Sequence, residues 1–274
     1  MDNTRMQVIG LCRFSYPALG GFQIEHDSVQ DRMAFLYDPV RMEERFATFE
    51  TMTLPSLRAQ SDGDFTLAIV VGTAMPAPLL ERLFDLVGDM EQAVIIPREP
   101  GRHRQVMREV INLVRDDDRP CHSLQFRMDD DDAVAIRFVE RLRAVAADLG
   151  PVLAQHRYVG IDFNQGHIAR IDAQGLCASP TIETLWTPAL GMAVAPGASR
   201  GIMNFSHAKL SRVMPVLSLP GEDMFIRGHN DFNDSRQKAG IRPVRLPRLD
   251  AAGEAEFKRI YNIDADHIRA RLAR

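Results

Sequence analysis

Strand-like and helix-like segments alternate along the first half of this 274-residue chain. Apolar runs typical of strands are each followed by a segment whose apolar residues recur at helical spacing. This order predicts βαβ units, in which mostly parallel strands form a central sheet and helices cover both faces. Pro55 should bend or end the first of these helices, because proline lacks the N–H that a helix needs. The expected strands are residues 7–14, 65–72, 93–96 and 123–128, and the expected helical segments are residues 39–60, 78–87, 106–114 and 134–149.

The second half of the chain is less regular and predicts a mixed arrangement. Its expected elements are strands at 157–163, 167–171 and 186–195, a hairpin turn at 172–175 and a short helix at 199–211. No repeat or composition break divides the chain, so we expect one domain over residues 1–274. Within it we expect a nucleotide- and metal-binding half at 1–150, an acceptor half at 151–240 and a C-terminal extension at 241–274. The extension has a helix-like end, for which docking on its own domain or on another subunit stays open.

Four consecutive aspartates, Asp129 to Asp132, follow the apolar run 123–128 directly. Four carboxylates this close repel one another strongly, so a compensating charge is required. A divalent cation is the usual compensator, and an oxygen-only cluster suits Mg²⁺ or Mn²⁺. The carboxyl end of a central strand is also where ligands bind in open α/β sheets. The alternative interpretation is a solvated acidic start of the next helix, stabilised by the helix dipole.

Composition argues against several classes of protein. A net charge of −4 lacks the basic surplus of a nucleic-acid binder. Three widely spaced cysteines argue against a disulfide framework and against a CxxC zinc site, and they fit a reducing compartment. No apolar stretch approaches the length of a membrane span and no signal-peptide pattern is present, so we expect a cytoplasmic protein. P-loop, GxSxG and GxGxxG motifs are absent, which disfavours NTPases, hydrolases and NAD-dependent enzymes.

Five blocks of sequence resemble one family of enzymes. In chain order they are VIGLCRFSY, LPSLRAQSDGDFTLAIVVG, FRMDDDDAV, IDFNQGHIAR and RGHNDFNDSRQK, spanning about residues 6–238. With these blocks the chain is similar to the bacterial rhamnosyltransferase family, within the GT-A-type nucleotide-sugar glycosyltransferases. The resemblance implies a GT-A-like fold and a glycosyltransferase that uses a nucleotide-diphosphate-sugar donor and a glycan or other hydroxyl acceptor. It also implies inversion at the sugar, with L-rhamnose as the sugar in the family's name.

In the GT-A pattern an Asp-x-Asp (DxD) motif binds the cation that bridges the diphosphate of the donor. The resemblance implies this role for Asp130 and Asp132, or for Asp129 and Asp131. We favour Asp130 and Asp132 as metal ligands, with Asp129 or Asp131 nearer the sugar or ribose. His229 is the expected further ligand, and Mg²⁺ or Mn²⁺ is the expected cofactor.

Inverting transfer also needs a general base and groups that neutralise the leaving diphosphate. The acidic pair Glu222 and Asp223 resembles the pair that supplies the base in many inverting GT-A enzymes. Asp231 and Asp234 are competing candidates. For the acidic pair, a structural role in a loop or helix cap is the open alternative. The candidate substrate-binding residues are Arg13, Phe14, Arg102, Arg104, Asp129, Asp162, Asn164, Gln165, Arg227, Arg236 and Lys238.

Two other classes of function stay open. A nucleotidyltransferase or phosphoesterase would keep the metal and the nucleotide, although a phosphoesterase commonly needs two metals and more scattered ligands. A sugar- or cation-binding module without catalysis would bind a cation in the absence of a nucleotide, whereas a glycosyltransferase should bind a nucleoside diphosphate in a metal-dependent way. The sequence does not predict the oligomeric state.

Overall fold

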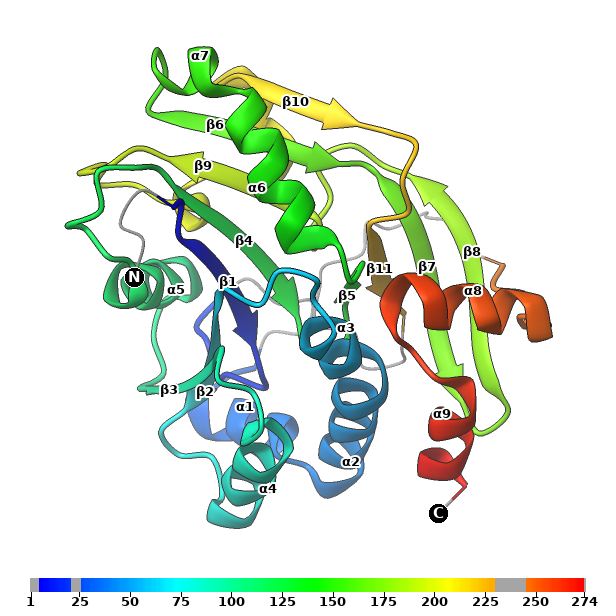
Figure 1. Ribbon diagram of the computed structural model, residues 1–274. Helices are drawn as coiled ribbons and strands as arrows, with labels where there is room; N and C mark the ends of the chain where they lie inside the picture. Colours follow the sequence, from blue (N-terminus) through cyan, green and yellow to red (C-terminus); the bar gives the residue numbers. More distant parts are fainter. Residues whose placement is uncertain (1–4, 21–25, 230–244, 274) are drawn as a thin grey trace.

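A seven-stranded sheet, in the order β10-β6-β9-β4-β1-β2-β3, forms the centre of the computed structural model (Figure 1). The structure describes residues 5–20, 26–229 and 245–273. Strand β9 is antiparallel to both of its neighbours, and the other neighbouring strands pair in parallel. The strands are β1 (Val8–Arg13), β2 (Thr66–Gly72), β3 (Ala93–Arg98), β4 (Ser123–Asp129), β6 (Tyr158–Phe163), β9 (Leu190–Val194) and β10 (Val216–Leu219). The predicted α/β fold class with a mostly parallel central sheet is confirmed.

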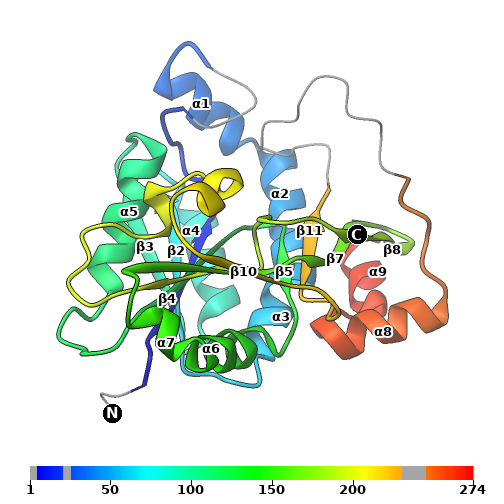
Figure 2. The same ribbon diagram turned by 90° about the horizontal axis from the view of Figure 1, so that it is seen from above.

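Helices cover both faces of this sheet. Figure 2 shows α5 and the short 3₁₀ helices on one face and α6 on the opposite face. Strands β1 and β2 are buried along almost their whole length, as expected of strands covered on both sides. The helices are α1 (Val29–Leu36), α2 (Pro39–Thr48), α3 (Leu54–Arg58), α4 (Ala77–Val87), α5 (His103–Val114), α6 (Phe138–Asp148), α7 (Gly150–Leu153), α8 (Ala251–Tyr261) and α9 (Ala265–Leu272).

A second sheet, in the order β5-β11-β7-β8, lies beside the first (Figure 1). Its strands are β5 (Ala133–Val134), β7 (Gln165–Asp172), β8 (Gly175–Ile182) and β11 (Phe225–Gly228). The predicted hairpin is confirmed, because β7 and β8 pair in antiparallel up to Asp172 and Gly175. Strand β11 pairs with β7 on one side and with β5 on the other. This pairing brings a late segment of the chain against the residues that follow the aspartates.

Two local predictions need correction. Pro55 does not end its helix, which excludes one of the two effects expected of it. A π-helix at Phe49–Thr53 joins α2 to α3, and the amide of Leu54 donates to the carbonyl of Phe49. The wider turn of the π-helix lies just before the proline and lets the helix continue past it. The segment predicted as a short helix at 199–211 forms two 3₁₀ helices instead, at 202–204 and 207–212. The amide of Ile202 there donates to the side-chain oxygen of Gln125 at 3.0 Å, outside any helical ladder.

The C-terminal helices α8 and α9 pack on their own domain. Phe257, Tyr261 and Ile268 belong to the same hydrophobic core as the central strands, and Figure 1 shows both helices beside β7 and β8. Arg271 of α9 also pairs with Glu50 at 2.8 Å and with Glu43 at 2.5 Å. Of the two docking sites left open by the sequence, the structure therefore shows the one on the same chain. None of the helices in the described ranges combines the length and apolarity needed to cross a membrane.

Candidate active site at the aspartate loop

The carboxyl ends of β1 and β4 meet where Arg13 and Asp129 are register partners. Nη2 of Arg13 lies 3.1 Å from Oδ1 of Asp129, so the last residues of the two strands form an ion pair. The chain then turns: the amide of Asp132 donates to the carbonyl of Asp129 at 3.2 Å, and the amide of Asp129 donates to Oδ2 of Asp132 at 3.0 Å. The other carboxylate oxygen of Asp132 accepts the amide of Gly228 at 3.2 Å. We call residues 129–132 the aspartate loop, and these bonds tie it to both sheets.

Three of the four aspartates bring their carboxylates together. One oxygen from each of Asp129, Asp131 and Asp132 lies within 4.8 Å of the other two. Asp131 and Asp132 are buried, whereas the side chain of Asp129 is 27% exposed. A carboxylate has several lone pairs, so each group can bind a cation in addition to accepting its present hydrogen bonds. These three residues, called the carboxylate cluster below, are thus compatible with a hard divalent metal.

Asp130, predicted as a metal ligand, lies apart from the carboxylate cluster. Its carboxylate pairs with Arg45 of α2, whose Nη1 also lies 3.2 Å from Oδ2 of Asp131. Both Arg45 and Asp130 are almost completely buried, and the carbonyl of Asp130 accepts the hydroxyl of Thr53 at 3.0 Å. The difference has a physical reason. Side chains alternate only along a strand, and β4 ends at Asp129, so the next three residues follow the geometry of a turn.

Burial and neighbouring charges give the carboxylates of the cluster different pKa values. Burial raises the pKa of Asp129, but the guanidinium groups of Arg13 and then Arg227 outweigh it and hold the pKa well below its usual range. Burial raises the pKa of Asp132 to about 8; Arg227 opposes this shift, and the carboxylate of Asp131 adds to it. One member of the cluster is therefore firmly ionised, while another binds a proton readily in the absence of a cation.

Two arginines beside the cluster have no oxygen acceptor among the described residues. Arg127 donates to Sδ of Met203 at 3.5 Å, and burial lowers its pKa to about 10. The guanidinium of Arg227 lies 5.9 Å from the ring centroid of Trp186, in a cation–π contact. Guanidinium groups form their strongest bonds with carboxylate and phosphate oxygens. Arg127 and Arg227 can therefore bind an anionic ligand next to the carboxylate cluster.

Two histidines near these arginines are neutral at neutral pH. Burial lowers the pKa of His103 to about 3, and the positive charge of Arg13 contributes. Burial and the charge of Arg127 also lower the pKa of His207, whose Nδ1 donates to the carbonyl of Leu185 at 2.7 Å. Neutral rings add hydrogen-bonding groups here without adding charge.

The early residues predicted to bind substrate lie in different places. Arg13 belongs to the site, but Phe14 lies in the core, with its ring 5.1 and 5.0 Å from two phenylalanine rings of α2 and the π-helix. Arg102 and Arg104 are exposed at the start of α5. Arg104 is close enough to Arg127 to lower its pKa, so it lies at the arginine side of the site.

The predicted residues at the end of β6 and directly after it make structural bonds. Oδ2 of Asp162 accepts the amide of Leu185 at 3.0 Å and the hydroxyl of Ser218 at 2.8 Å, and burial raises the pKa of this carboxyl. Oδ1 of Asp162 and Oδ1 of Asn164 are buried and accept no hydrogen bond within the described part of the chain. Such atoms are costly unless water or a ligand donates to them.

The acidic pair predicted to supply the base lies just before β11. Glu222 is exposed and pairs with Arg141 at 2.7 Å, and Asp223 accepts the side-chain amide of Gln165 at 3.0 Å. The aspartate loop contacts the other end of β11, at Gly228. At about 3.3 Å per residue, Asp223 is ~16 Å from Gly228 along the extended chain. The structure therefore does not bring this pair to the carboxylate cluster.

His229 follows β11, and its amide donates to the carbonyl of Ala169 at 2.8 Å. Its side chain lines a cavity between α2 and β7 and does not belong to the group of three carboxylates. The predicted residues Asp231, Asp234, Arg236 and Lys238 lie outside the described residues.

Sequence reasoning missed Arg45, Arg127 and His207. For the two arginines a signal was present. Arg45 directly precedes an apolar residue, Phe46, of the face that α2 buries, and Arg127 is a charged residue inside an apolar strand. A buried charge needs a partner, so each arginine indicated an anion nearby.

Comparison with known protein families adds to this geometry. A model of the family described as "Putative rhamnosyl transferase" matches residues 7–242. The chain belongs to this family. The resemblance found in the five sequence blocks is confirmed, and with it the assignment to a family of glycosyltransferases. Comparison with curated proteins gives no match for this rhamnosyl transferase family member.

Several solved structures are similar to the chain at low identity. The S. aureus TarS 1–349 structure in complex with UDP-GlcNAc has a TM-score of 0.43 and 9% identity, covering 84% of this chain and 60% of that one. The TarS complex with UDP has a TM-score of 0.41 and 9% identity, covering 82% of this chain and 61% of that one. A putative glucose-1-phosphate thymidylyltransferase from Bacillus anthracis, in complex with a sucrose, has a TM-score of 0.35 and 10% identity, with coverages of 80% and 88%. The chain thus spans about 60% of the TarS structures, and scores this low carry no argument about its activity.

Proposed function

We propose that this rhamnosyl transferase family member moves a sugar from a nucleoside-diphosphate donor to a hydroxyl acceptor in a metal-dependent reaction with inversion. The observation that supports this most is the carboxylate cluster beside Arg127 and Arg227. Carboxylates suit a hard cation and arginines suit diphosphate oxygens, so one site has groups for both parts of a metal–nucleotide complex. L-rhamnose is the sugar that the family description indicates.

In this proposal Asp129, Asp131 and Asp132 would hold Mg²⁺ or Mn²⁺. His229 is kept as a candidate further ligand because it follows Gly228 directly in the sequence, although it lines the cavity on the other side of that residue. Bound there, the cation supplies positive charge for the diphosphate. Arg13 keeps Asp129 ionised and in place through its 3.1 Å contact. Arg127 and the neighbouring arginines bind and orient the diphosphate, and they stabilise the charge that develops as it leaves.

The transfer itself exchanges one bond for another. The acceptor oxygen bonds to the anomeric carbon on the face opposite the diphosphate. The bond from that carbon to the phosphate oxygen breaks, and its electron pair leaves with the nucleoside diphosphate. The hydroxyl proton passes to a carboxylate base. Glu222, Asp223, Asp231 and Asp234 are the candidate bases, and we favour Asp231 because it follows Gly228 by three residues in the sequence, whereas the acidic pair lies beyond the far end of β11.

The proposal also covers the outer cationic residues, the extent of the domain and the location of the protein. Arg102, Arg104, Arg236 and Lys238 are proposed as outer cationic groups for the donor. One domain covers residues 1–274, with the halves and extension expected from the sequence. A cytoplasmic location fits the cysteines, which form no disulfide in the described structure.

Calorimetric titration with UDP, dTDP and GDP, each with Mn²⁺ and then with EDTA, tests the donor site. We expect one nucleoside diphosphate to bind with Mn²⁺, and EDTA to abolish this binding. The isosteric changes Asp131→Asn and Asp132→Asn should weaken it by about tenfold or more, because each removes a charged ligand. Glu256→Gln, which changes an exposed carboxylate, should leave it unchanged. A folded protein that binds none of the three nucleotides would show the proposal to be wrong.

A further inference from the structure

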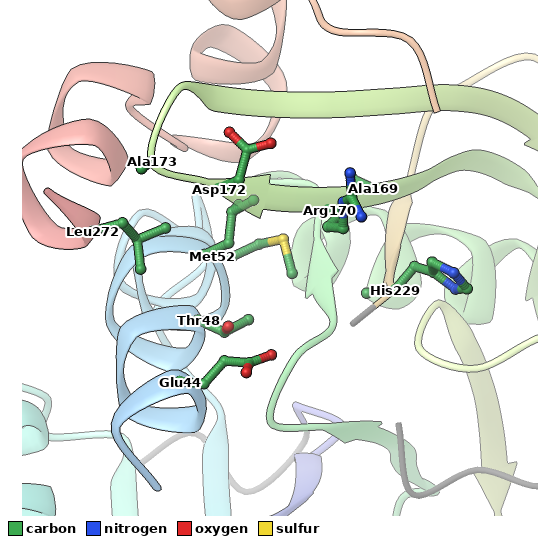
Figure 3. A pocket seen from close by; sticks show the side chains of 11 residues that line it. Glu44, Thr48, Met52, Ala169, Arg170, Asp172, Ala173, His229 and Leu272 are labelled. Atoms are coloured by element: carbon green, nitrogen blue, oxygen red, sulfur yellow. The ribbon is translucent and has the colours of Figure 1, made fainter. Parts of the chain in front are cut away.

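A cavity of about 410 Å³ lies between α2 and β7 (Figure 3). One wall is a face of α2 and of the π-helix that follows it, from which Glu44, Thr48 and Met52 extend at four-residue spacing. The opposite wall is the end of β7, and Leu272 of α9 closes one side. This volume lies within the range of sites that bind small molecules, roughly 300–1,000 Å³.

The lining of the cavity combines hydrogen-bonding groups with apolar surface. Figure 3 shows the carboxylate of Glu44 and the hydroxyl of Thr48 on the α2 side, with the side chains of Met52 and Leu272 beside them. A carboxylate accepts hydrogen bonds from hydroxyl groups, and a hydroxyl both donates and accepts. Leu272 is partly exposed and can pack against C–H surface, whereas Met52 is 1% exposed and belongs to the core beneath the cavity. A sugar offers both kinds of surface, with hydroxyl groups at its edge and C–H groups on its faces.

The cavity differs in charge from the arginine side of the aspartate loop. The lining includes the carboxylates of Glu44 and Asp172 and the guanidinium of Arg170, and Asp172 also pairs with Arg248 at 2.6 Å. The cavity therefore has no excess of positive charge to attract a phosphate group. Arg127 and Arg227, which attract phosphate, are not among the lining residues. A neutral polyhydroxyl ligand therefore suits the cavity better than a second nucleotide does.

The cavity and the carboxylate cluster share a backbone wall at Gly228. This residue lines the cavity, and its amide donates to Oδ1 of Asp132 at 3.2 Å. A methyl group at Gly228 would lie only 2.1 Å from the carbonyl oxygen of Asp131, so the backbones approach as closely as glycine allows. A ligand in the cavity is thus separated from the metal-binding residues by one thickness of chain.

We propose that this cavity binds the acceptor, a neutral carbohydrate or similar polyhydroxyl compound. The proposal rests on the glycosyl transfer proposed above. In it, Glu44 and Thr48 bind acceptor hydroxyls and Leu272 packs against the C–H face. The reacting hydroxyl reaches the donor side around the edge of the wall at Gly228. Glu44 and Thr48 are then residues that select the acceptor.

The test uses the whole protein and two kinds of probe. The first is Mn²⁺ with the nucleoside diphosphate that binds, measured by calorimetry. The second is a set of methyl α-glycosides of glucose, mannose and rhamnose at millimolar concentration, measured by saturation-transfer NMR. Leu272→Trp fills the cavity at its C-terminal side, and Glu44→Gln removes a charge without changing the shape. Leu113→Trp, at a residue that is 62% exposed on α5, is the matched control.

We expect at least one glycoside to bind the wild type and Leu113→Trp. In Leu272→Trp this binding should be lost and in Glu44→Gln weakened about tenfold, while nucleotide affinity stays within about twofold. Glycoside binding that persists in Leu272→Trp, or a wild type that binds no glycoside, would overturn the acceptor assignment. Glycosides that bind in the cavity while no nucleoside diphosphate binds would instead refute glycosyl transfer and leave a carbohydrate-binding site.

Discussion

Arg45 offers a direct test of how the aspartate loop is held. Its guanidinium pairs with Asp130 and Asp131, and all three residues are at most 4% exposed. Arg45→Met keeps most of the side-chain length but removes the cation, which leaves two buried carboxylates without it. Removing one partner of a buried ion pair costs about 3–5 kcal/mol. Because two carboxylates share this arginine, we expect a loss near the upper end of that range.

The assay is urea unfolding followed by far-UV circular dichroism and by the fluorescence of Trp186, the single tryptophan. Arg45→Met combined with Asp130→Asn should recover about 2 kcal/mol of the loss, because a neutral amide replaces one stranded carboxylate. Arg259→Met removes an arginine of an exposed pair and should produce no measurable change.

Two results would refute this reasoning. One is a loss below about 1 kcal/mol for Arg45→Met, which is the scale of an exposed ion pair. The other is a double variant that is no more stable than Arg45→Met alone, since the cost would then come from lost packing rather than from stranded charge.

Three further predictions follow from particular contacts. Gly228→Ala should abolish nucleotide binding in calorimetry, because its methyl group would lie 2.1 Å from a carbonyl oxygen of the aspartate loop. Arg127→Leu should weaken binding of a nucleoside diphosphate by about tenfold or more and leave binding of the nucleoside unchanged, because the lost contact is to phosphate. The hydrogen bond from Arg82 lowers the pKa of Glu43 to about 2. Partial burial of Glu43 opposes this shift, and the hydrogen bond from Arg271 adds to it. The stabilising effect of these hydrogen bonds is complete above the ordinary pKa of 4.5 and is lost as the pH falls toward 2, so the stability gap between wild type and Arg271→Gln in urea unfolding should narrow over that window.

Control variants distinguish loss of the specific contact in each prediction from a general disruption of the fold. Gly150→Ala adds a methyl group that meets nothing within 4 Å and should leave nucleotide binding intact. Arg212→Leu changes an exposed arginine and should not affect phosphate binding. Equal losses for nucleoside and nucleoside diphosphate in Arg127→Leu would contradict the phosphate contact. A stability gap for Arg271→Gln that is constant with pH would contradict the role of Glu43.

The strands of the first half could be predicted because each is a long apolar run with a helical segment after it. Strands β5 and β11 could not, because two and four residues are too short for a periodic pattern to indicate a strand. Their pairing comes from contacts across the fold, between residues 133–134 and 225–226. Gly228 is likewise far from the aspartate loop in the sequence, so its contact with the loop was not predicted.

The gathering of carboxylates after β4 could be predicted, but which of the aspartates converge could not. Carboxylate repulsion indicated that the four residues need a compensating charge. Part of that compensation is Arg45, 85 residues earlier in the sequence, and no local pattern connects it to Asp130. The turn after Asp129 then decides which side chains converge, and turn geometry depends on bonds to Gly228 in the other half of the chain.

The pairing of the aspartates with arginines predicts how removal of the metal affects the fold. Arg45 and Arg13 already pair with three of the four aspartates, so the fold does not need a cation to offset their repulsion. EDTA should therefore abolish nucleotide binding while far-UV circular dichroism and cooperative urea unfolding persist, with only the stability lost that bound metal adds by mass action. Unfolding by EDTA alone would mean that the arginines do not compensate the carboxylates and that the metal is structural. Retention of the fold would assign Asp130 and Arg45 to structure and leave the other three carboxylates for the ligand.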